Sequence, residues 1–512
     1  MLVRVEVVNS GDAVLRSVVS EEWEVHQRVV SLEFGPARDE APADPAVVCL
    51  EEVGGARVGA VSGPLSVSVD VELEVGERRV FWFRFGLELG EIDPEAVYSQ
   101  SLAGLRARLP SVSEPPEAVV EIPWHAAMLT GAACVDGVLG GHTLDQGSAY
   151  SFRHGFNGAA RDPLQHALPL VYLEPDLALS VLRNTCAWGS PDGDLPYALD
   201  GRKQPWTQFF RPSDSNLWAL WLAAEYGLVT GDLGAFAQPV GYHPVHEADP
   251  VSLKENLRRQ FRFFVDSVGV GEHGHVRILN ADWNDMAITE SGVDRDEMIG
   301  HGSSVLNSAM AAWVLPVYAR LAERLGDTGT AAEAREYGAE LRERVAAEWN
   351  GRWFRRAYGP GAVVGDDSLW LEVQPWAILC GAADDDQARE LLSTIDRICR
   401  TGSPLGARVR EGGPIWFSIN MTLVWAAAKY DRELAWDEWR RMTLHAHSEA
   451  YPGIWSGTLS GPDAYLPPES DRPGETWAWP DLGIAMQAYP VANLHSHSQP
   501  LLAYFRLLGR EP

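Results

Sequence analysis

The sequence predicts a mainly α-helical protein, in which an (α/α)6 barrel follows a small antiparallel β-sandwich and a helical linker. Three observations predict this architecture. Apolar residues alternate with a period of two up to about residue 89, amphipathic helical runs follow from about residue 122, and long aromatic-rich loops recur between pairs of those runs. We therefore expect the β-sandwich over residues 1–91, the linker over 92–120 and the barrel over 121–512.

The β-sandwich is predicted from stretches in which inward and outward residues alternate. "VRVEVV", "LSVSVDVELEV" and "RVFWFRFGLEL" show this pattern, and the Asn-Ser-Gly and Gly-Pro breaks between them are typical of turns. Residues 93–109 then have a helical pattern, and the Pro- and Ser-rich segment 110–118 ends it. Together these two segments predict the linker.

The barrel is predicted from about a dozen amphipathic runs of roughly 10 to 20 residues each. Several runs end in Gly or Asp shortly before the next one, which indicates consecutive helical hairpins. Aromatic-rich loops between the hairpins would meet at one end of a closed ring, so the ring is favoured over an open solenoid. The predicted helices lie near residues 123–134, 163–172, 176–187, 213–230, 251–268, 303–325, 329–349, 373–380, 385–399, 415–429, 434–446 and 498–508.

The charge and composition exclude some classes of partner. The 512 residues include 71 acidic and 42 basic side chains, which gives a formal net charge of −29, and no run is rich in Lys or Arg. A nucleic-acid backbone or an anionic membrane would be repelled, so we expect neither as a partner. The 20 tryptophans can fill a core, but they can equally stack on the C–H faces of sugar rings.

The cysteines and the N-terminal residues predict a cytoplasmic protein. The five cysteines are scattered, odd in number and never in a CxxC pair, which favours buried thiols over disulfides or a zinc site. The first residues alternate and form no basic segment followed by an apolar core. No apolar stretch reaches the roughly 18 residues of a membrane span.

The segment "DWND", Asp282 to Asp285, places two carboxyls and a large aromatic ring within four residues. One interpretation is an Asx turn at a helix start with a buried tryptophan. The other is chemical, because glycoside cleavage needs a carboxyl that keeps its proton near pH 7, and an apolar wall such as Trp283 raises a carboxyl pKa. One aspartate would then orient the backbone or a sugar hydroxyl, and the other would donate the proton.

Residues 145–166 form a polar loop that leads into a predicted helix beginning at Pro163. Arg161 and Asp162 stand at the end of this loop. They can form a simple salt bridge at the helix N-terminus, or they can hold several hydroxyls of one sugar. The residues alone leave both interpretations open.

Residues 454–481 form another candidate wall, rich in Pro, Gly and Trp. The carboxyls of Asp463, Glu469 and Glu475 alternate there with aromatic rings such as Trp477. Such a loop can be a rigid wall of a site or an ordinary cap of the barrel. A carboxylate opposite the acid could act as general base on water. Inverting glycosidases keep their two carboxyls about 6.5 to 9.5 Å apart, against about 5 to 5.5 Å in retaining ones.

Metal and nucleotide sites are not indicated. His495 and His497 in "LHSHSQP" resemble a metal tract, but two histidines near the C-terminus favour helix capping. No glycine-rich phosphate loop and no GxSxG elbow occurs where a strand meets a helix. We therefore expect neither a metal nor an organic cofactor.

Taken together, the motifs resemble the catalytic domain of the cellobiose and chitobiose phosphorylases, over about residues 146–508. "RDPLQH" resembles the family's Arg-Asp-x-x-Gln segment, "PSDSNLW" resembles its Ser-Asp-x-x-x-Trp helix, and "ADWNDM" matches its Asp-Trp-Asn-Asp signature. The resemblance implies an N-terminal β-sandwich, a linker and an (α/α)6 barrel. It also implies a possible homodimer, because these phosphorylases are commonly dimers.

The resemblance also implies roles for individual residues. The last aspartate of the signature, here Asp285, would be the general acid, and Trp283 would line the sugar site. Arg161 and Asp162 would lie near the non-reducing sugar, and Gln165 completes the Arg-Asp-x-x-Gln segment.

Two departures from the family change the expected reaction. The sandwich is far shorter than the family's usual one, and "RPGETWAWPDLG" replaces the Thr-Gly-Ser/Thr-Ala loop that helps to hold phosphate in the phosphorylases. Glu475 in this segment would repel phosphate and could deprotonate water instead. Arg472, Thr476, His495 and His497 could still build an anion site.

We therefore expect an inverting glycoside hydrolase that cleaves an oligosaccharide or a glucoside, with Asp285 as the acid and Glu475 as the base. Asp463 and Glu469 are the reserve candidates for the base. One alternative is an inverting phosphorylase that uses inorganic phosphate as co-substrate, and another is a non-catalytic carbohydrate-binding barrel. The predicted sugar contacts are Arg161, Asp162, Gln165, Asp282, Trp283, Asp463, Glu469 and Trp477.

Overall fold

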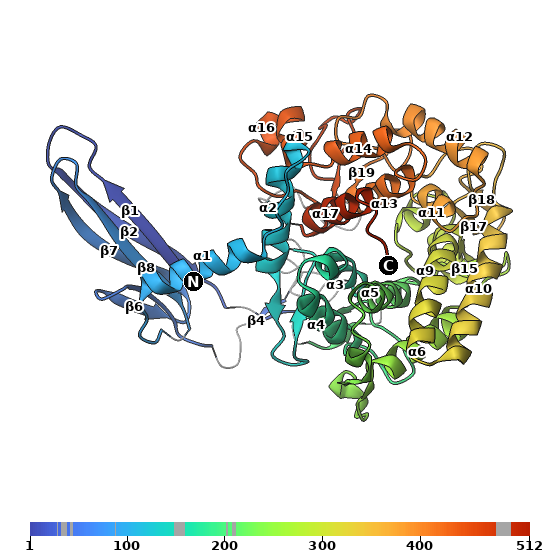
Figure 1. Cartoon of the computed structure of the whole chain (residues 1–512), viewed down its shortest axis with the longest axis horizontal. Coiled ribbons are helices and arrows are strands. Elements are labelled where there is room, and N and C mark those ends of the chain that lie inside the picture. The colour runs from blue at the N-terminus through green and yellow to red at the C-terminus, as the bar shows by residue number, and fades with distance from the viewer. Residues whose placement is uncertain are drawn as a thin grey trace. The chain divides into compact units, whose positions relative to one another are not determined.

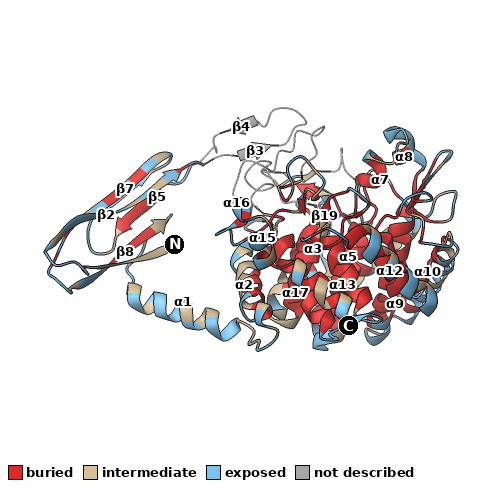
Figure 2. Ribbon diagram, turned by 90° about the horizontal axis from the view of Figure 1, so that it is seen from above, coloured by how far each residue is buried: buried red, intermediate tan, exposed pale blue. Residues whose placement is uncertain are grey.

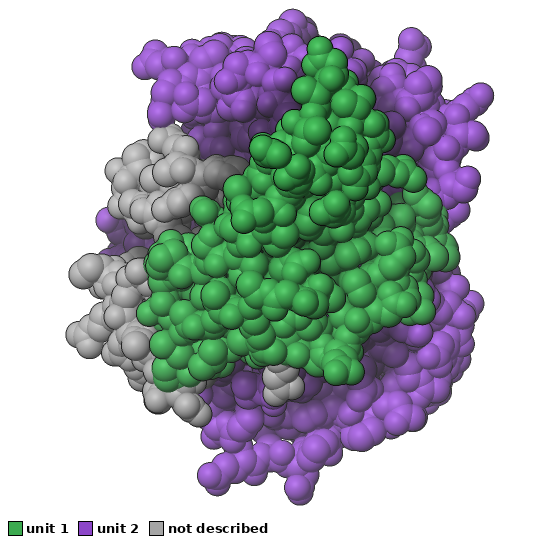
Figure 3. Space-filling view, turned by 90° about the vertical axis from the view of Figure 1, so that its left-hand side faces the viewer, with its two compact units in different colours: residues 1–109 green, residues 110–512 purple. Residues whose placement is uncertain are grey.

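The computed structural model of the chain has two compact units, residues 1–109 and 110–512 (Figure 3). The boundary between them falls inside the predicted linker, so that residues 92–109 belong to the first unit and 110–120 to the second. The structure describes all residues except 28, 32–37, 41–44, 88, 148–158, 201–202, 207–210 and 478–492.

Two antiparallel sheets of the first unit share one apolar core, and β3 and β4 form a separate short pair. One sheet has the strand order β1-β8-β5-β6, and in the other β2 pairs with β7 along its whole length. Buried side chains from both sheets, such as Val67 and Phe83, form the core. The strands are β1 (Leu2–Val8), β2 (Leu15–Val25), β3 (Val29–Ser31), β4 (Arg38–Glu40), β5 (Val48–Glu52), β6 (Arg57–Ala60), β7 (Gly63–Leu73) and β8 (Arg78–Gly86).

The three stretches with the clearest alternation correspond to β1, β7 and β8. Strand β2 follows the pattern less well because Val18 and Val19 are adjacent; Val18 is exposed and Val19 faces the core. Helix α1 (Pro94–Arg108) ends the unit, and the Asp93 side chain caps it by accepting a hydrogen bond from the Ala96 N–H at 3.0 Å.

The second unit is mainly helical, as predicted, and most of its helices begin and end within a few residues of the expected positions. Helix α2 begins earlier than predicted, at Pro116, because proline in a first helical turn lacks an N–H that would have no partner there. The helices are α2 (Pro116–Ala132), α3 (Arg161–Ala167), α4 (Pro175–Cys186), α5 (Ser215–Thr230), α6 (Leu253–Phe263), α7 (Met286–Thr289), α8 (Arg295–His301), α9 (Val305–Arg324), α10 (Thr328–Ala346), α11 (Val373–Leu379), α12 (Asp385–Ile395), α13 (Phe417–Ala427), α14 (Arg432–Arg441), α15 (Leu444–Ala450), α16 (Pro452–Trp455) and α17 (His495–Leu507).

Six of these helices contact one another in a closed succession. The order is α3, α5, α9, α11, α13 and α17, and α17 returns to contact α3. Helices α2, α4, α6, α10 and α14 each pack against a member of this ring from outside (Figure 1). The ring helices are the more buried ones in Figure 2. A closed succession of this kind is what an (α/α)6 barrel requires.

Tryptophans fill the interior between the ring helices. The Trp221 ring of α5 lies 5.3 Å from the Trp313 ring of α9 and 5.4 Å from the Trp376 ring of α11, measured between centroids. The Trp425 ring of α13 lies 4.7 Å from Trp313. All four rings are buried, so these tryptophans belong to the core and are not platforms for a sugar.

Helix α9 is long and apolar enough to cross a membrane by length and composition alone. However, 89% of its apolar window is buried inside the unit, where α5, α10 and α11 pack against it. Helix α9 is therefore the central core helix of this unit. Among the described residues, no other helix meets the same test of length and apolarity.

Several connecting segments gather at one end of the ring helices. Figure 2 shows α7, α8 and β19 together at this end. Short antiparallel strand pairs brace the connections, and one group of four has the order β15-β16-β17-β18. The strands are β9 (Cys134–Val135), β10 (His142–Thr143), β11 (Ala198–Leu199), β12 (Pro205–Trp206), β13 (Pro239–Val240), β14 (Val251–Ser252), β15 (Val276–Arg277), β16 (Ser303–Ser304), β17 (Ala357–Gly359), β18 (Ala362–Val364), β19 (Ile415–Trp416) and β20 (Ala464–Tyr465).

Candidate active site

The "DWND" segment lies in the loop between β15 and α7. The Asn284 N–H donates to Asp282 Oδ1 at 3.0 Å, and the Met286 N–H donates to Asn284 Oδ1 at 3.2 Å. The segment thus contains the Asx turns that the first interpretation expected. The side chain of Asp285 takes no part in these turns, so it is available for another role.

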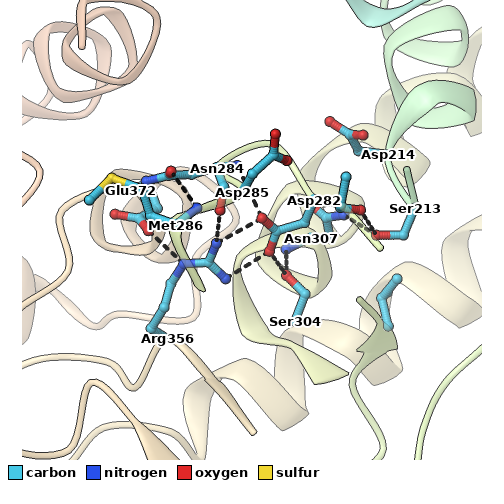
Figure 4. Close-up of polar contacts among 12 residues, drawn as sticks. Ser213, Asp214, Asp282, Asn284, Asp285, Met286, Ser304, Asn307, Arg356 and Glu372 are labelled. Atoms are coloured by element: carbon cyan, nitrogen blue, oxygen red, sulfur yellow. Dashed lines mark hydrogen bonds and ion pairs between the residues drawn. The ribbon is translucent and has the colours of Figure 1, made fainter. Parts of the chain in front are cut away.

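Asp282 is an anchor of this loop. Its carboxylate is fully buried and forms an ion pair with Arg356 at 2.8 Å, and it accepts a hydrogen bond from the Ser304 hydroxyl at 2.7 Å (Figure 4). The Arg356 guanidinium also pairs with Glu372 at 2.6 Å. Because its oxygens are occupied by these partners, Asp282 holds the loop in place, and it does not line the cavity beside Asp285.

Arg161, the first residue of α3, connects its own segment to the "DWND" loop. Its Nη1 donates to the Asp282 carbonyl oxygen at 2.6 Å. Its guanidinium also lies 3.5 Å from the Asp214 carboxylate, 3.8 Å from Asp285 and 3.9 Å from Asp162. One buried cation is therefore shared among three carboxyls, which is more than the simple salt bridge with Asp162 that the first interpretation allowed.

Asp285 has the environment of a carboxyl that keeps its proton. Burial raises the pKa of Asp285 to about 7, although the nearby Arg161 cation opposes this rise and the Asp282 carboxylate adds to it. Its Oδ1 is buried and has no hydrogen-bond partner among the described residues. Near neutral pH this side chain can therefore hold a proton and also release it.

A cavity of about 60 Å³ lies against Asp285. It combines carboxyl, amide, guanidinium and indole groups from segments far apart in the chain. Of the predicted site residues, the structure brings Arg161, Asp162, Gln165, Trp283, Asp285 and Asp463 together here. The other lining residues are Gln146, Ala159, Tyr197, Trp416, Ser418, Ile419 and His495.

Two glutamines of the cavity have unused hydrogen-bonding groups. Both amide atoms of Gln165 and the Oε1 of Gln146 are buried, and they have no partner among the described residues. A buried polar group without a partner costs about 1 to 3 kcal/mol. A ligand with several hydroxyls would supply the missing partners, so the cavity suits a sugar better than an apolar ligand.

Asp463, Trp416 and His495 line the cavity from segments other than those of Arg161 and Asp285, and these three residues are called the opposite wall below. The Asp463 Oδ1 lies 3.8 Å from His495 Nε2, and its side chain is 19% exposed. Burial raises the pKa of the Asp463 carboxyl, whereas an interaction with His495 and a hydrogen bond from Trp416 oppose the rise. Asp463 is thus the one predicted candidate for the base that borders the same cavity as Asp285.

Glu475 and Glu469, the other two candidates for the base, do not line this cavity. Glu475 pairs with Arg472 at 3.1 Å and is 33% exposed. Glu469 pairs with Arg408, and its side chain is 54% exposed. Both are solvent-facing members of ion pairs in the loop, so the structure supports neither the predicted choice of Glu475 as base nor a sugar contact by Glu469.

Of the two tryptophans predicted to contact the sugar, one lines the cavity and the other does not. Trp283 lines the cavity and packs edge-on against Trp218, with 5.5 Å between ring centroids. Trp477 does not line it; its ring lies 5.1 Å from the Trp416 ring, which does. Trp477 therefore packs against a lining residue, and its predicted sugar contact stays a prediction.

Comparison with known proteins assigns the chain to a family. Residues 148–410 match the profile of the glycosyl hydrolase 94 superfamily, catalytic domain, which is more than half of the chain. The chain belongs to this superfamily. The resemblance to the cellobiose and chitobiose phosphorylases that the motifs predicted is thereby confirmed.

Two relatives and one solved structure illustrate this placement. The chain is 27% identical over 257 residues to solabiose phosphorylase of Paenibacillus borealis, which is 48% of this chain and 31% of the relative. It is 25% identical over 250 residues to cellobionic acid phosphorylase of Neurospora crassa, which is 46% of this chain and 30% of the relative. The chain thus spans about a third of the length of the curated relatives it matches.

A rhamnosidase from Klebsiella oxytoca with rhamnose bound has a similar fold. The TM-score is 0.51 with 13% identity, over 99% of this chain and 88% of that one. At this level of identity the similarity concerns the fold alone.

The superfamily match covers only one side of the cavity. Arg161, Asp162 and Asp285 lie within the matched residues, whereas Asp463 and His495 lie beyond residue 410. The acid and the charged groups around it thus belong to the part that this chain shares with the superfamily. The opposite wall is built from residues outside the match.

Some site residues of this superfamily member were not among the predicted ones. Asp214 lies in the "PSDSNLW" segment, and its Oδ2 accepts a hydrogen bond from the Trp218 indole at 2.9 Å while it faces Arg161. The resemblance to the Ser-Asp-x-x-x-Trp helix was the signal for it. Tyr197 and Trp416 carry no motif, because they reach the cavity from separate segments, and Trp416 ends strand β19.

Metal chemistry was not predicted for this superfamily member. Among the described residues, no group of three or more His, Cys, Asp or Glu side chains is placed to hold a metal ion. His495 lies beside carboxyls at the cavity, and His497 is buried beside Ser460, whose Oγ lies 2.8 Å from its Nε2. The two histidines have separate environments, and neither caps the start of α17 as expected: the structure records no side-chain cap there.

Proposed function

We propose that this chain cleaves a glycosidic bond of an oligosaccharide or a glycoside with inversion, and that Asp285 is the general acid. The observation that carries the proposal is the state of Asp285: a carboxyl with a pKa raised to about 7 by burial, and with a free Oδ1, beside a polar cavity. A carboxyl that is partly protonated at neutral pH suits proton donation to a leaving oxygen.

The residues around Asp285 suit each stage of this step. Before cleavage, the amides of Gln165 and Gln146 offer hydrogen bonds to sugar hydroxyls, and Trp283 offers an apolar wall. As Asp285 gives its proton to the glycosidic oxygen, it becomes a carboxylate. The Arg161 guanidinium, 3.8 Å away, then stabilises the new negative charge.

Phosphorolysis is the reaction we favour, in place of the hydrolysis that the sequence motifs suggested. The relatives named above are phosphorylases. The carboxyl that seemed suited to activate water, Glu475, faces solvent and pairs with Arg472. Inorganic phosphate needs no general base, because it is itself the nucleophile. Residues 478–483 of the segment that replaces the phosphate loop lie outside the described residues.

Hydrolysis is the second candidate, because the described lining of the cavity favours it in one respect. Asp162, Asp285 and Asp463 line the cavity against a single cation, Arg161. Such a lining attracts a phosphate anion weakly, and Asp463 could serve as base on water. In that reaction Asp463 would take the role that the sequence assigned to Glu475.

The two reactions are separated by their products. The protein is incubated with a panel of disaccharides and aryl glycosides, with and without inorganic phosphate. Phosphorolysis gives a sugar 1-phosphate only when phosphate is present, whereas hydrolysis gives free sugar at the same rate in both samples. Sugar binding without either product would support the non-catalytic alternative and contradict the proposal.

We also propose three further properties of the chain. The helical unit closes as an (α/α)6 barrel, the chain works in the cytoplasm, and it forms a homodimer. The closed succession of helix contacts supports the barrel. All five cysteines are free thiols, which fits a reducing compartment. The resemblance to dimeric phosphorylases supports the dimer, and light scattering on the purified chain measures its mass in solution.

A further inference from the structure

Two histidine rings are in contact at the cavity, and one of them, His495, lines it. His166 lies in α3, and His495 is the first residue of α17. The Nε2 of His166 is 3.3 Å from the Nδ1 of His495, and both side chains are buried. Two ring nitrogens at this distance can share only one hydrogen, so the pair has a defined donor and a defined acceptor.

A main-chain carbonyl decides which ring is the donor. The Nδ1 of His166 lies 2.8 Å from the Leu144 carbonyl oxygen, which can only accept, so this Nδ1 carries hydrogen. Burial, with a smaller effect from His495, lowers the pKa of His166 to about 3, so the ring is neutral at neutral pH. Its Nε2 is then an acceptor. It follows that His495 donates from Nδ1.

The other nitrogen of His495 therefore has no hydrogen when the ring is neutral. This Nε2 faces two carboxyls, with 3.5 Å to Asp162 Oδ1 and 3.8 Å to Asp463 Oδ1. A nitrogen lone pair that faced two carboxylates would be repelled by both. The arrangement is stable only if one proton lies within this group of three, hereafter the His495 triad (His495, Asp162 and Asp463).

We propose that the contact from Leu144 through His166 to His495 fixes one proton in the His495 triad, and that Asp463 carries it. The Arg161 Nε lies 3.9 Å from Asp162 Oδ1, which favours Asp162 as the charged member. Asp463 then carries its proton on the oxygen that faces His495 Nε2 at 3.8 Å, and the Trp416 indole donates to the same carboxyl. His166 is thus a positioning residue that sets the charge of a group it does not touch.

The electrostatic environment of each member agrees with this distribution of charge. Burial raises the pKa of both Asp162 and Asp463 and lowers that of His495. The Arg161 cation lowers the pKa of all three, and Asp463 raises that of His495. Burial is the largest effect on each of the three pKa values, and it favours the neutral form of each group.

The proton on Asp463 affects which reaction the cavity can support. A protonated Asp463 cannot take a proton from water, so the cavity has no resting general base on this wall. This favours phosphorolysis over the second candidate reaction. The inference rests on the proposed function only in naming a sugar as the ligand, because the count of protons follows from the described side chains alone.

The test uses the full chain and two matched substitutions of His166. His166→Phe keeps a flat ring but removes the acceptor, so His495 should change to the tautomer with hydrogen on Nε2 and the proton of Asp463 should be lost. His166→Gln keeps both functions, because its amide N–H can donate to the Leu144 carbonyl and its amide oxygen can accept from His495. His166→Gln should therefore resemble the wild type.

Two spectroscopic measurements at neutral pH read the outcome without any substrate. Nitrogen-15 NMR of labelled histidines should find His495 with hydrogen on Nδ1 in the wild type and in His166→Gln, and on Nε2 in His166→Phe. Infrared spectra, recorded in an Asp285→Asn background to remove the band of the acid, should contain a protonated-carboxyl band. This band should disappear in His166→Phe and in Asp463→Asn.

A second variant keeps the test decisive if His166→Phe fails to fold. Asp162→Asn supplies an N–H to His495 Nε2, so Asp463 should ionise and the same infrared band should be lost while the His495 tautomer stays unchanged. A wild type without a band that Asp463→Asn abolishes would overturn the inference, and so would a band that persists in both His166→Phe and Asp162→Asn. An inactive chain that nevertheless shows the band would contradict the proposed function and leave the proton assignment standing.

Discussion

The two walls of the cavity are built in different ways. The acid wall, here Arg161, Asp162, Gln165, Trp283 and Asp285, comes from two short motifs within the superfamily match. The opposite wall, here Trp416, Asp463 and His495, comes from three segments beyond that match.

Ion pairs stabilise the acid wall, whereas a hydrogen bond between neutral histidine rings orients His495 on the opposite wall. On the acid wall, a buried network joins Arg356, Asp282 and Arg161, and it fixes the loop that carries Asp285. On the opposite wall, His495 is oriented by His166. Short motifs supply most of the charged groups of the acid wall. The opposite wall instead depends on segments that come together only after folding.

The largest expected effect is on the acid itself. Asp285→Asn keeps the shape of the side chain and removes the proton that it donates, so kcat should fall by about 10² to 10⁴. The measurement is kcat on the substrate identified by the product assay, with circular dichroism to show that the variant is folded. Activity equal to that of the wild type would place the acid elsewhere.

The second largest effect is expected on the free energy of unfolding, when the buried ion-pair network of Arg356 is broken. Arg356→Met would leave the carboxylates of Asp282 and Glu372 buried without their cation, and loss of one partner of a buried ion pair costs about 3 to 5 kcal/mol. Urea unfolding should show this loss of free energy of unfolding. Arg389→Met, at an exposed pair, is the matched control and should cost less than about 1 kcal/mol. Equal costs for the two variants would show that the network is not a structural anchor.

A smaller effect is expected on the pH profile. The acid must be protonated to act, so activity should fall as the pH rises above the Asp285 pKa of about 7. Arg161 lowers this pKa because its cation favours the carboxylate. Arg161→Met should therefore move the alkaline limb of the kcat profile to higher pH, by about one unit or more. A shift to lower pH would contradict the assigned contact.

The smallest effect on stability and activity is expected for a substitution of Glu475. Comparing it with a substitution of Asp463 tests which of the two carboxyls acts in the cavity. Glu475→Gln removes one partner of an exposed ion pair, so its free energy of unfolding should change by less than about 1 kcal/mol. Its kcat should stay within about threefold of the wild type, because Glu475 does not line the cavity and a substitution away from a site changes free energies by about 0.5 kcal/mol or less. Asp463→Asn should lower kcat/KM more than Glu475→Gln does. The reverse order would restore Glu475 as the base.

The periodic pattern predicted the helices because each one buries a stripe of its own residues. Helix α10, expected over 329–349, covers Thr328–Ala346, and α13, expected over 415–429, covers Phe417–Ala427. The start of α2 was missed, since the pattern gives no sign of how many turns precede Pro123. Strand β2 was obscured by the adjacent valines Val18 and Val19.

The helical periodicity, the family and the acid wall could be predicted from the residues alone, because Arg161, Asp162 and Gln165 lie within one turn or two of a helix and Trp283 and Asp285 lie within one loop. The choice of the distant carboxyl that lines the cavity with Asp285 depends on the folded chain. Asp463, Glu469 and Glu475 are equivalent as residue types, and their different roles arise from partners elsewhere: His495 for Asp463, Arg408 for Glu469 and Arg472 for Glu475. The orientation of a side chain in a long loop depends on such non-local contacts, and spacing along the chain does not encode them.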